Sequence, residues 1–172
     1  MKGLLASALV LMAGCGFNSP ESSSAQADAG DNGSPPGSTP QDAPPAARCS
    51  TYSYSYNGHK YRMVDTAISW TDASNNCASD GGYLLKIESS GEDNQAAYLI
   101  SGPSEIWIGL RDGTNTGSYV WTDNTPPTFT HWGAAPNAAS PDCVVKNTLV
   151  TDGRWYPRDC TSTRAVVCEC NP

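Results

Sequence analysis

Cysteine is the residue type whose number and spacing could support the most chemistry in this chain. Seven cysteines occur among the 172 residues. Cys15 stands alone directly after a short apolar run, where a thiol could carry a lipid. The remaining cysteines form an even set, which is typical of a disulfide framework built in an oxidising compartment. This set consists of Cys49, Cys77, Cys143, Cys160, Cys168 and Cys170.

The residues before Cys15 have the parts of a secretory signal peptide. Lys2 supplies a positive charge, and Leu4 to Met12 is an apolar run far shorter than the ~20 residues that a membrane-spanning helix needs. The run Leu11-Met12-Ala13-Gly14-Cys15 resembles a bacterial lipobox. This resemblance implies cleavage after residues 1–14 and lipidation of Cys15, with an ordinary secretory signal as the alternative.

The sequence predicts a tether followed by one domain. Residues 15–47 are rich in Ser, Ala, Gly and Pro and are expected to form a disordered spacer behind the lipidated Cys15. Residues 48–172 are expected to form the folded domain, held by its lipid in a bacterial cell envelope. The outer membrane is favoured where the cell has one, because Gly16 is not the Asp that signals retention in the inner membrane.

Charge and motif content exclude several classes of function. The formal net charge of the chain is −7, and no basic stripe exists, which argues against nucleic acid as a partner and against direct binding to anionic lipid. Neither His59 nor His131 lies near a nucleophile motif, and no phosphate-binding loop or paired-histidine metal motif occurs. We therefore expect the protein not to be an enzyme.

Local patterns predict the elements that must position any binding site. Aromatic residues alternate with Ser before Asn57-Gly58, which indicates a β-hairpin. Ser69 with Asp72 is expected to begin one helix, and Ser90 with Asp93 a second helix whose Ala96, Ala97 and Ile100 face inward. Short strands are expected at residues 83–87, 107–110, 119–121, 143–145 and 165–169. Two helices with short strands and long loops give an α+β class.

A larger set of residues resembles the C-type lectin-like domain in order and spacing. The matching residues include Trp70-x-x-Ala73-x-x-x-Cys77, Gly81-Gly82-x-Leu84, Trp107-Ile108-Gly109-Leu110, Trp121, Trp132, Cys143, Trp155, Cys160 and Val167-Cys168-Glu169. The resemblance spans residues 49 to 170. It implies two helices, short antiparallel strands, a long loop region and the disulfides Cys77–Cys168 and Cys143–Cys160. Cys49 and Cys170 remain, and we expect them to form a third bridge, Cys49–Cys170, because they flank the two terminal strands, which are neighbours in this fold. The resemblance also implies that the matching tryptophans pack in the core.

The family resemblance also implies where a metal would bind. Sugar-binding members hold Ca²⁺ in the long loop, and Ca²⁺ needs about 6–8 oxygen ligands. Here the family's acidic triplet reads Ala135-Pro136-Asn137, proline precedes Asp142, and the Trp-Asn-Asp triplet reads Trp155-Tyr156-Pro157. Most ligands are therefore missing, although Asp112, Asn137 and Asp142 could hold Ca²⁺ together with carbonyls and water. The favoured interpretation is that these residues shape turns, and that no cofactor is bound.

The leading hypothesis is a surface-anchored recognition module that binds carbohydrate or protein through residues 123 to 160 without the family's calcium site. Candidate ligand-binding residues are Asn137, Asp142, Arg154 and Tyr156. One alternative is a Ca²⁺-dependent lectin with a rebuilt site. Another is a structural or assembly protein of the cell envelope.

Overall fold

The structure is a computed structural model that describes residues 49–99, 102–149 and 152–172. Cys15, the expected signal peptide, the tether, Arg48 and Ile100 lie outside the described residues. Among the residues that the structure describes, no helix is both long and apolar enough to cross a membrane.

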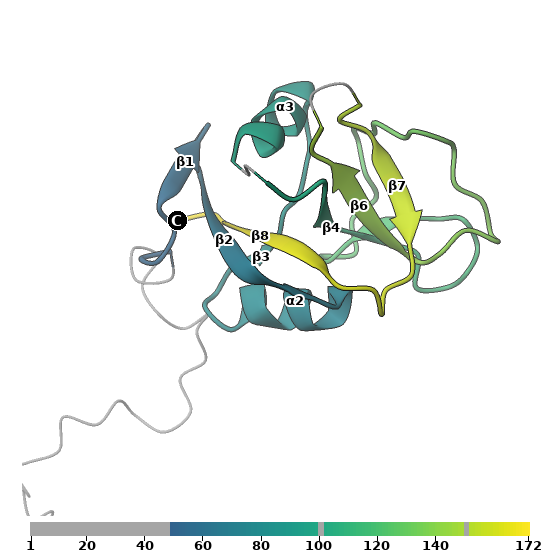
Figure 1. The fold of residues 1–172 in the computed structure, drawn as a ribbon, viewed down its shortest axis with the longest axis horizontal. Coiled ribbons are helices and arrows are strands. Elements are labelled where there is room, and N and C mark those ends of the chain that lie inside the picture. The colour runs from purple at the N-terminus through teal and green to yellow at the C-terminus, as the bar shows by residue number, and fades with distance from the viewer. Residues whose placement is uncertain (1–48, 100–101, 150–151) are drawn as a thin grey trace, which may run out of the picture. The chain divides into compact units, whose positions relative to one another are not determined.

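Eight strands form one twisted sheet in the described part of the chain (Figure 1). The main path runs β1-β2-β8-β4-β6-β7, while β3 pairs with β8 and β5 pairs with β4. The strands are β1 Tyr54–Tyr56, β2 His59–Ile68, β3 Tyr83–Leu84, β4 Glu105–Arg111, β5 Val120–Trp121, β6 Cys143–Asn147, β7 Trp155–Arg158 and β8 Arg164–Cys170. The pairings are antiparallel except for β4 with β8, which is parallel.

The predicted hairpin is β1 and β2. Asn57 and Gly58 have φ angles of 50° and 87°. A two-residue turn with positive φ at both positions matches the right-handed twist of the flanking strands. The turn thereby fixes the register Tyr56↔His59 and Tyr54↔Tyr61.

Helix α2 spans Trp70–Ala78 and begins as expected. The Ser69 side chain accepts a hydrogen bond from the Asp72 backbone N–H, which satisfies one of the free donors at the helix start. Trp70, Ala73 and Cys77 form its buried face. Gly81, with φ 83°, follows the helix and turns the chain toward β3.

Helix α3 spans Ser90–Tyr98, and its cap differs from the expectation. Ser89, one residue earlier than predicted, accepts from the Glu92 backbone N–H. The Glu92 side chain in turn accepts from the Glu88 backbone N–H at 2.7 Å. Asp93 therefore does not take part in the cap, contrary to the expectation. Its side chain is buried, as is that of Ala96.

The two helices pack on opposite faces of the sheet (Figure 1). Successive side chains of β8 point to opposite faces of the sheet and so pack in different clusters. Val166 and Cys168 pack with the α2 residues, whereas Val167 packs in the other cluster, which contains Ala96 of α3. Trp107, Trp121 and Trp155 are fully buried, in agreement with the resemblance, while Trp132 packs partly buried against the core.

Three disulfides join the pairs Cys49–Cys170, Cys77–Cys168 and Cys143–Cys160. The first links the start of the described residues to the end of β8, and the second links α2 to β8. The third closes the segment that contains β7. These bridges and the two helices confirm the predicted C-type lectin-like α+β fold.

Three details of the sheet differ from the expectation. β7 was not predicted, because Pro157 cannot donate to a ladder and its flanks are polar. The strand expected at 83–87 ends at Leu84, after which the Leu85 backbone N–H still donates to Val167 O. The parallel pairing of β4 with β8 joins segments about 60 residues apart in sequence, too far for local patterns to reveal.

Candidate functional site

The long loop between β5 and β6, with the segment between β4 and β5, carries most of the predicted ligand residues. It forms the irregular trace beside β6 and β7 in Figure 1. The Cys143–Cys160 bridge and the pairing Cys143↔Arg158 hold its base. The Tyr119 hydroxyl donates to Pro141 O at 2.7 Å and ties the two segments together.

Asp112 is buried and uses its carboxylate to shape the loop that follows it. Oδ1 accepts from the Thr114 backbone N–H at 3.0 Å and from the Thr114 hydroxyl at 3.1 Å, while Oδ2 accepts from the Gly117 backbone N–H. Burial alone would raise the pKa of Asp112, but these hydrogen bonds outweigh it and lower the pKa. The carboxylate therefore stays ionised while serving its own backbone.

Asn137 likewise bonds its own turn. Its side-chain Oδ1 accepts from the Ala139 backbone N–H at 2.9 Å, and its backbone N–H donates to Ser140 Oγ at 3.0 Å. This is the self-bonded turn that Asn favours. Gly117 packs against this backbone, since a Cβ atom there would lie 3.1 Å from Ala138 N. Asp112 and Asn137 are therefore neighbours through Gly117, with their side-chain oxygens already engaged.

Asp142 faces a hollow of about 510 Å³ that is lined by polar groups of the long loop and of the segment after β7. Its carbonyl accepts from the Asp112 backbone N–H at 2.7 Å. In the orientation that satisfies both groups, the Asn115 amide nitrogen donates to the Asp142 carboxylate. Asp159 and Thr161 line the hollow too.

Hydrogen bonds lower the pKa of the Asp159 carboxyl. The main cause is the Thr161 backbone N–H, which donates to Oδ1 at 2.8 Å, and the Thr161 hydroxyl adds a second bond. A carboxylate has about four acceptor positions, so Asp159 retains capacity to accept from a ligand. The hollow thus offers carboxylate acceptors beside hydroxyl and amide groups.

These residues do not fit the family's calcium cage. Ca²⁺ needs several oxygens that converge on one point, and here the Asp112 and Asn137 side chains bond their own loops. Within the described ranges, no group of three or more His, Cys, Asp or Glu side chains is placed to hold a metal ion.

Tyr156 and Arg154 form a second group around Asp152. The Tyr156 hydroxyl donates to Asp152 Oδ2 at 2.8 Å, and Arg154 Nε lies 3.8 Å from Oδ1. The Tyr156 ring lies on Gly133, where a Cβ atom would come within 2.2 Å of Cε1. Arg154 remains 53% exposed. Tyr156 therefore packs on the long loop, and Arg154 is the more accessible of the two.

A buried charged network was missed by the sequence analysis. Lys146 Nζ donates to Asp93 Oδ1 at 2.9 Å and to Gly153 O at 2.6 Å. The Trp155 indole N–H donates to the same Asp93 oxygen at 2.7 Å, and His131 Nδ1 lies 2.8 Å from Oδ2. A lysine in the middle of the apolar strand β6 was the available signal, since a buried lysine requires a partner.

Comparison with known proteins identifies the family. The profile of the Lectin C-type domain matches residues 66–170. Lectin BRA-3 of Megabalanus rosa is 31% identical over 118 residues, which cover 66% of this chain and 72% of that protein. The alpha-N-acetylgalactosamine-specific lectin of Patiria pectinifera is 30% identical over 126 residues, covering 66% and 75%.

A solved structure of a calcium-independent type II antifreeze protein has a similar fold. It is 27% identical, with a TM-score of 0.64, and the match covers 71% of this chain and 92% of that one. The named lectins are binding proteins, in agreement with the prediction that this chain is not an enzyme. Fold, disulfides and sequence together place the chain in the C-type lectin domain family.

Proposed function

We propose that this protein is a carbohydrate-recognition module whose long-loop surface binds sugar without a calcium cage. The observation that carries the proposal is the use of the Asp112 and Asn137 side-chain oxygens in internal hydrogen bonds. These hydrogen bonds take up acceptor positions on both side chains, which disfavours their use as ligands that bridge a metal and a sugar. Direct hydrogen bonding from protein to sugar is the mode of recognition that remains.

The hollow beside Asp142 supplies chemistry suited to that mode. The Asp142 and Asp159 carboxylates accept from sugar hydroxyls, and hydrogen bonds to charged acceptors are stronger than neutral ones. Thr161 and Asn115 can both donate and accept. The relatives named as lectins support carbohydrate as the ligand class, and the similar antifreeze protein is named as calcium-independent.

The proposal includes a lipid anchor on Cys15 in a bacterial cell envelope. The run Leu11-Met12-Ala13-Gly14-Cys15 supports it, as do three disulfides, which persist in oxidising compartments. Mass spectrometry of the protein from its native host would test it. An acylated N-terminal Cys15 is expected, and an unmodified residue there would contradict the anchor.

A glycan array probed with the full chain, in calcium and in chelator, tests the binding proposal. We expect the same glycans to bind in both buffers. The melting temperature should also be unchanged by millimolar Ca²⁺, whereas a ligand at about 100 times its Kd would add ~2.7 kcal/mol of stability. Binding abolished by chelator would favour a calcium-dependent lectin with a rebuilt site. The absence of any glycan binding would favour a protein partner or a structural role.

A charge-removing variant locates the site. Asp142→Asn should weaken glycan binding about tenfold, because a hydrogen bond to a charged group contributes ~1.5–3 kcal/mol. Asp72→Asn is the matched control, since Asp72 is exposed on α2 and lies outside the hollow. Equal binding by both variants would place the sugar elsewhere.

A further inference from the structure

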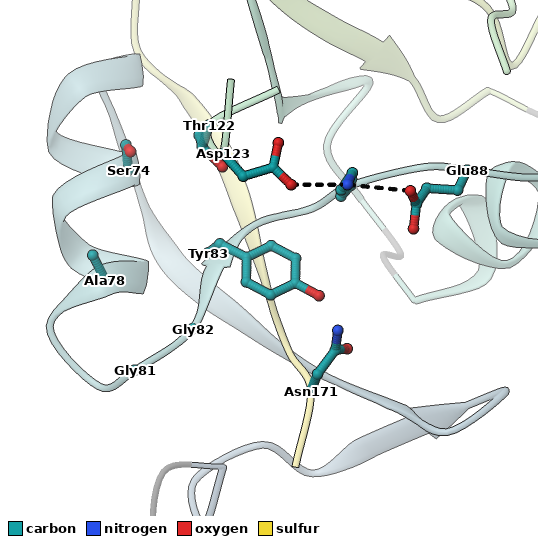
Figure 2. Close-up of a pocket in the computed structure, with 10 residues that line it drawn as sticks. Ser74, Ala78, Gly81, Gly82, Tyr83, Glu88, Thr122, Asp123 and Asn171 are labelled. Carbon is teal, nitrogen blue, oxygen red and sulfur yellow. Dashed lines mark hydrogen bonds and ion pairs between the residues drawn. The ribbon is translucent and has the colours of Figure 1, made fainter. Parts of the chain in front are cut away.

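A second hollow lies between α2, β3 and the turn after β5, and it shares no residue with the long-loop hollow. Its volume is about 460 Å³, within the range of ~300–1,000 Å³ that small-molecule sites occupy. Figure 2 shows the Tyr83 ring between Asp123 and Asn171, with Ser74 and Ala78 of α2 forming the facing wall.

Tyr83 is held rigidly. Its backbone pairs with Glu169 of β8, and its hydroxyl donates to Glu169 Oε1 at 2.9 Å. Glu169 is almost fully buried, accepts from the Lys86 backbone N–H at 2.9 Å and also contacts His59. Burial, together with the neighbouring Glu169 carboxylate, raises the pKa of Tyr83, so the hydroxyl remains a donor. An aromatic ring fixed in this way binds a ligand with little loss of conformational entropy.

The rim of the hollow is polar, and its charges are largely paired. Lys86 Nζ lies 2.9 Å from Asp123 Oδ2 and 3.1 Å from Glu88 Oε1. Burial alone would raise the pKa of Asp123, but hydrogen bonds from Thr125 and Lys86 lower it to about 2. Asp123 is 50% exposed, so an ionised acceptor stands at the opening, with the Asn171 amide on the other side of the ring (Figure 2).

A smaller hollow of about 230 Å³ adjoins this one. The two share Ser74 of α2 and Thr122 after β5. In the smaller hollow the Arg111 guanidinium lies 5.4 Å from the centre of the Trp70 ring and supplies fixed donors. Together the two hollows make a groove along α2.

We propose that this α2 groove is a second carbohydrate-binding site, which takes a neutral oligosaccharide with one sugar ring stacked on Tyr83. A sugar presents an apolar C–H face and a polar edge, which match an aromatic ring and a rim of carboxylate and amide groups. Anions are disfavoured by the Asp123 and Glu88 carboxylates, and Lys86 is already paired with both of them. The proposal does not depend on the long-loop site.

Titration of the full chain with neutral trisaccharides tests the proposal. Maltotriose, cellotriose and mannotriose would be followed by NMR through the Tyr83 ring protons, with choline and inorganic phosphate as charged probes. We expect at least one trisaccharide to shift these signals. Tyr83→Ala should weaken its binding about tenfold or more, whereas Tyr83→Phe, which keeps the ring, should stay within about threefold. Tyr98→Ala removes an exposed tyrosine outside the groove and should bind normally.

The outcomes separate the two sugar sites. Binding lost in Tyr83→Ala but kept in Asp142→Asn supports the α2 groove. If Tyr83→Ala does not fold, Asn171→Ala replaces it, because Asn171 is exposed and lies after the last strand. No shift at Tyr83 with any trisaccharide would overturn the proposal, as would unchanged affinity in folded Tyr83→Ala, or a shift produced by choline or phosphate alone.

Discussion

The charged side chains that the fold buries are the residues that depend most on their hydrogen-bond and ion-pair partners. One oxygen of Asp93 accepts hydrogen bonds from Lys146 and Trp155, and the other oxygen contacts His131. Ionised groups can be buried only when they are paired and hydrogen-bonded. The network joins α3 to β6 and β7, so it orients the strand that carries Tyr156.

Removal of the Lys146 ammonium should be costly. Lys146→Met retains the length of the side chain but leaves the Asp93 carboxylate buried without its cation. We expect the free energy of unfolding to fall by about 3–5 kcal/mol, as is typical when one member of a buried ion pair is lost. Urea denaturation measures the change. Lys60→Met, on the partly exposed strand β2, is the control and should change stability by less than about 1 kcal/mol.

Asp123 should make stability depend on pH. The pKa of Asp123 is about 2 in the folded protein against an ordinary value of 3.8, so the unfolded chain binds the proton more readily. The contribution is therefore present above pH 3.8 and is lost as pH falls toward about 2. Asp123→Asn should flatten the slope of unfolding free energy against pH in this window. An unchanged slope in urea denaturation would contradict the assignment.

At the scale of elements, both helices begin with a serine cap, but their signals differ in clarity. In α2, Ser69 and Asp72 are the only pair placed to cap before Trp70. In α3, Ser89 and Ser90 are adjacent, and each has an acidic residue three positions later. In the structure Ser89 and Glu92 form the cap of α3, because the Asp93 side chain takes part in the buried network instead.

This choice can be tested with two neighbouring serines. Ser89→Ala should lower the free energy of unfolding by about 1 kcal/mol, since loss of a cap leaves a helix donor unsatisfied. Ser90→Ala, at the first helical position, should cost less than half of that. Thermal and urea denaturation of both variants would decide. A larger effect at Ser90 would assign the cap to that residue instead.

Local signals account for what could be predicted among the elements. Asn57-Gly58 specified a hairpin turn, and Ser69 specified the start of α2, because each acts on residues close in sequence. β7 and the pairing of Lys146 with Asp93 depend on contacts between distant segments. Such contacts leave no periodic pattern, so the sequence indicated the scaffold better than it indicated the site.

At the scale of the whole molecule, the disulfides close loops of very different length. Cys143–Cys160 spans 17 residues in sequence, and Cys77–Cys168 spans 91. In the chain-entropy description a longer loop restricts the unfolded state more. The short bridge holds the base of the long loop, while the long bridge holds α2 against the sheet.

Removal of each bridge should reveal this difference. Replacing Cys143 and Cys160 by Ala should cost about 3 kcal/mol, and replacing Cys77 and Cys168 about 4–5 kcal/mol. Urea denaturation compares the two variants at one pH. A greater loss from the short bridge would show that native-state packing at the loop, rather than chain entropy, sets the order.

The candidate site was predictable only in part, for reasons visible in particular residues. The substitution pattern at Ala135-Pro136-Asn137 predicted a poor calcium cage, and Asn137 bonds its own turn. Asp159 and Thr161 were not singled out, because their relation to Asp142 arises from the return of the chain after β7. Tyr83 gave no signal, since only the packing of α2 beside β3 makes its ring the floor of a groove.

The Cys49–Cys170 bridge has a mechanical consequence. Tension that enters the chain ahead of Cys49 and leaves it beyond Cys170 is carried by a single disulfide bond, which bypasses a sequence separation of 121. The sheet, both helices and the long-loop hollow lie inside that covalent ring and are bypassed by the load, whereas Asn171 of the α2 groove lies just beyond it. A molecule held at one end and pulled at the other would keep its sheet and its long-loop hollow intact until a covalent bond broke.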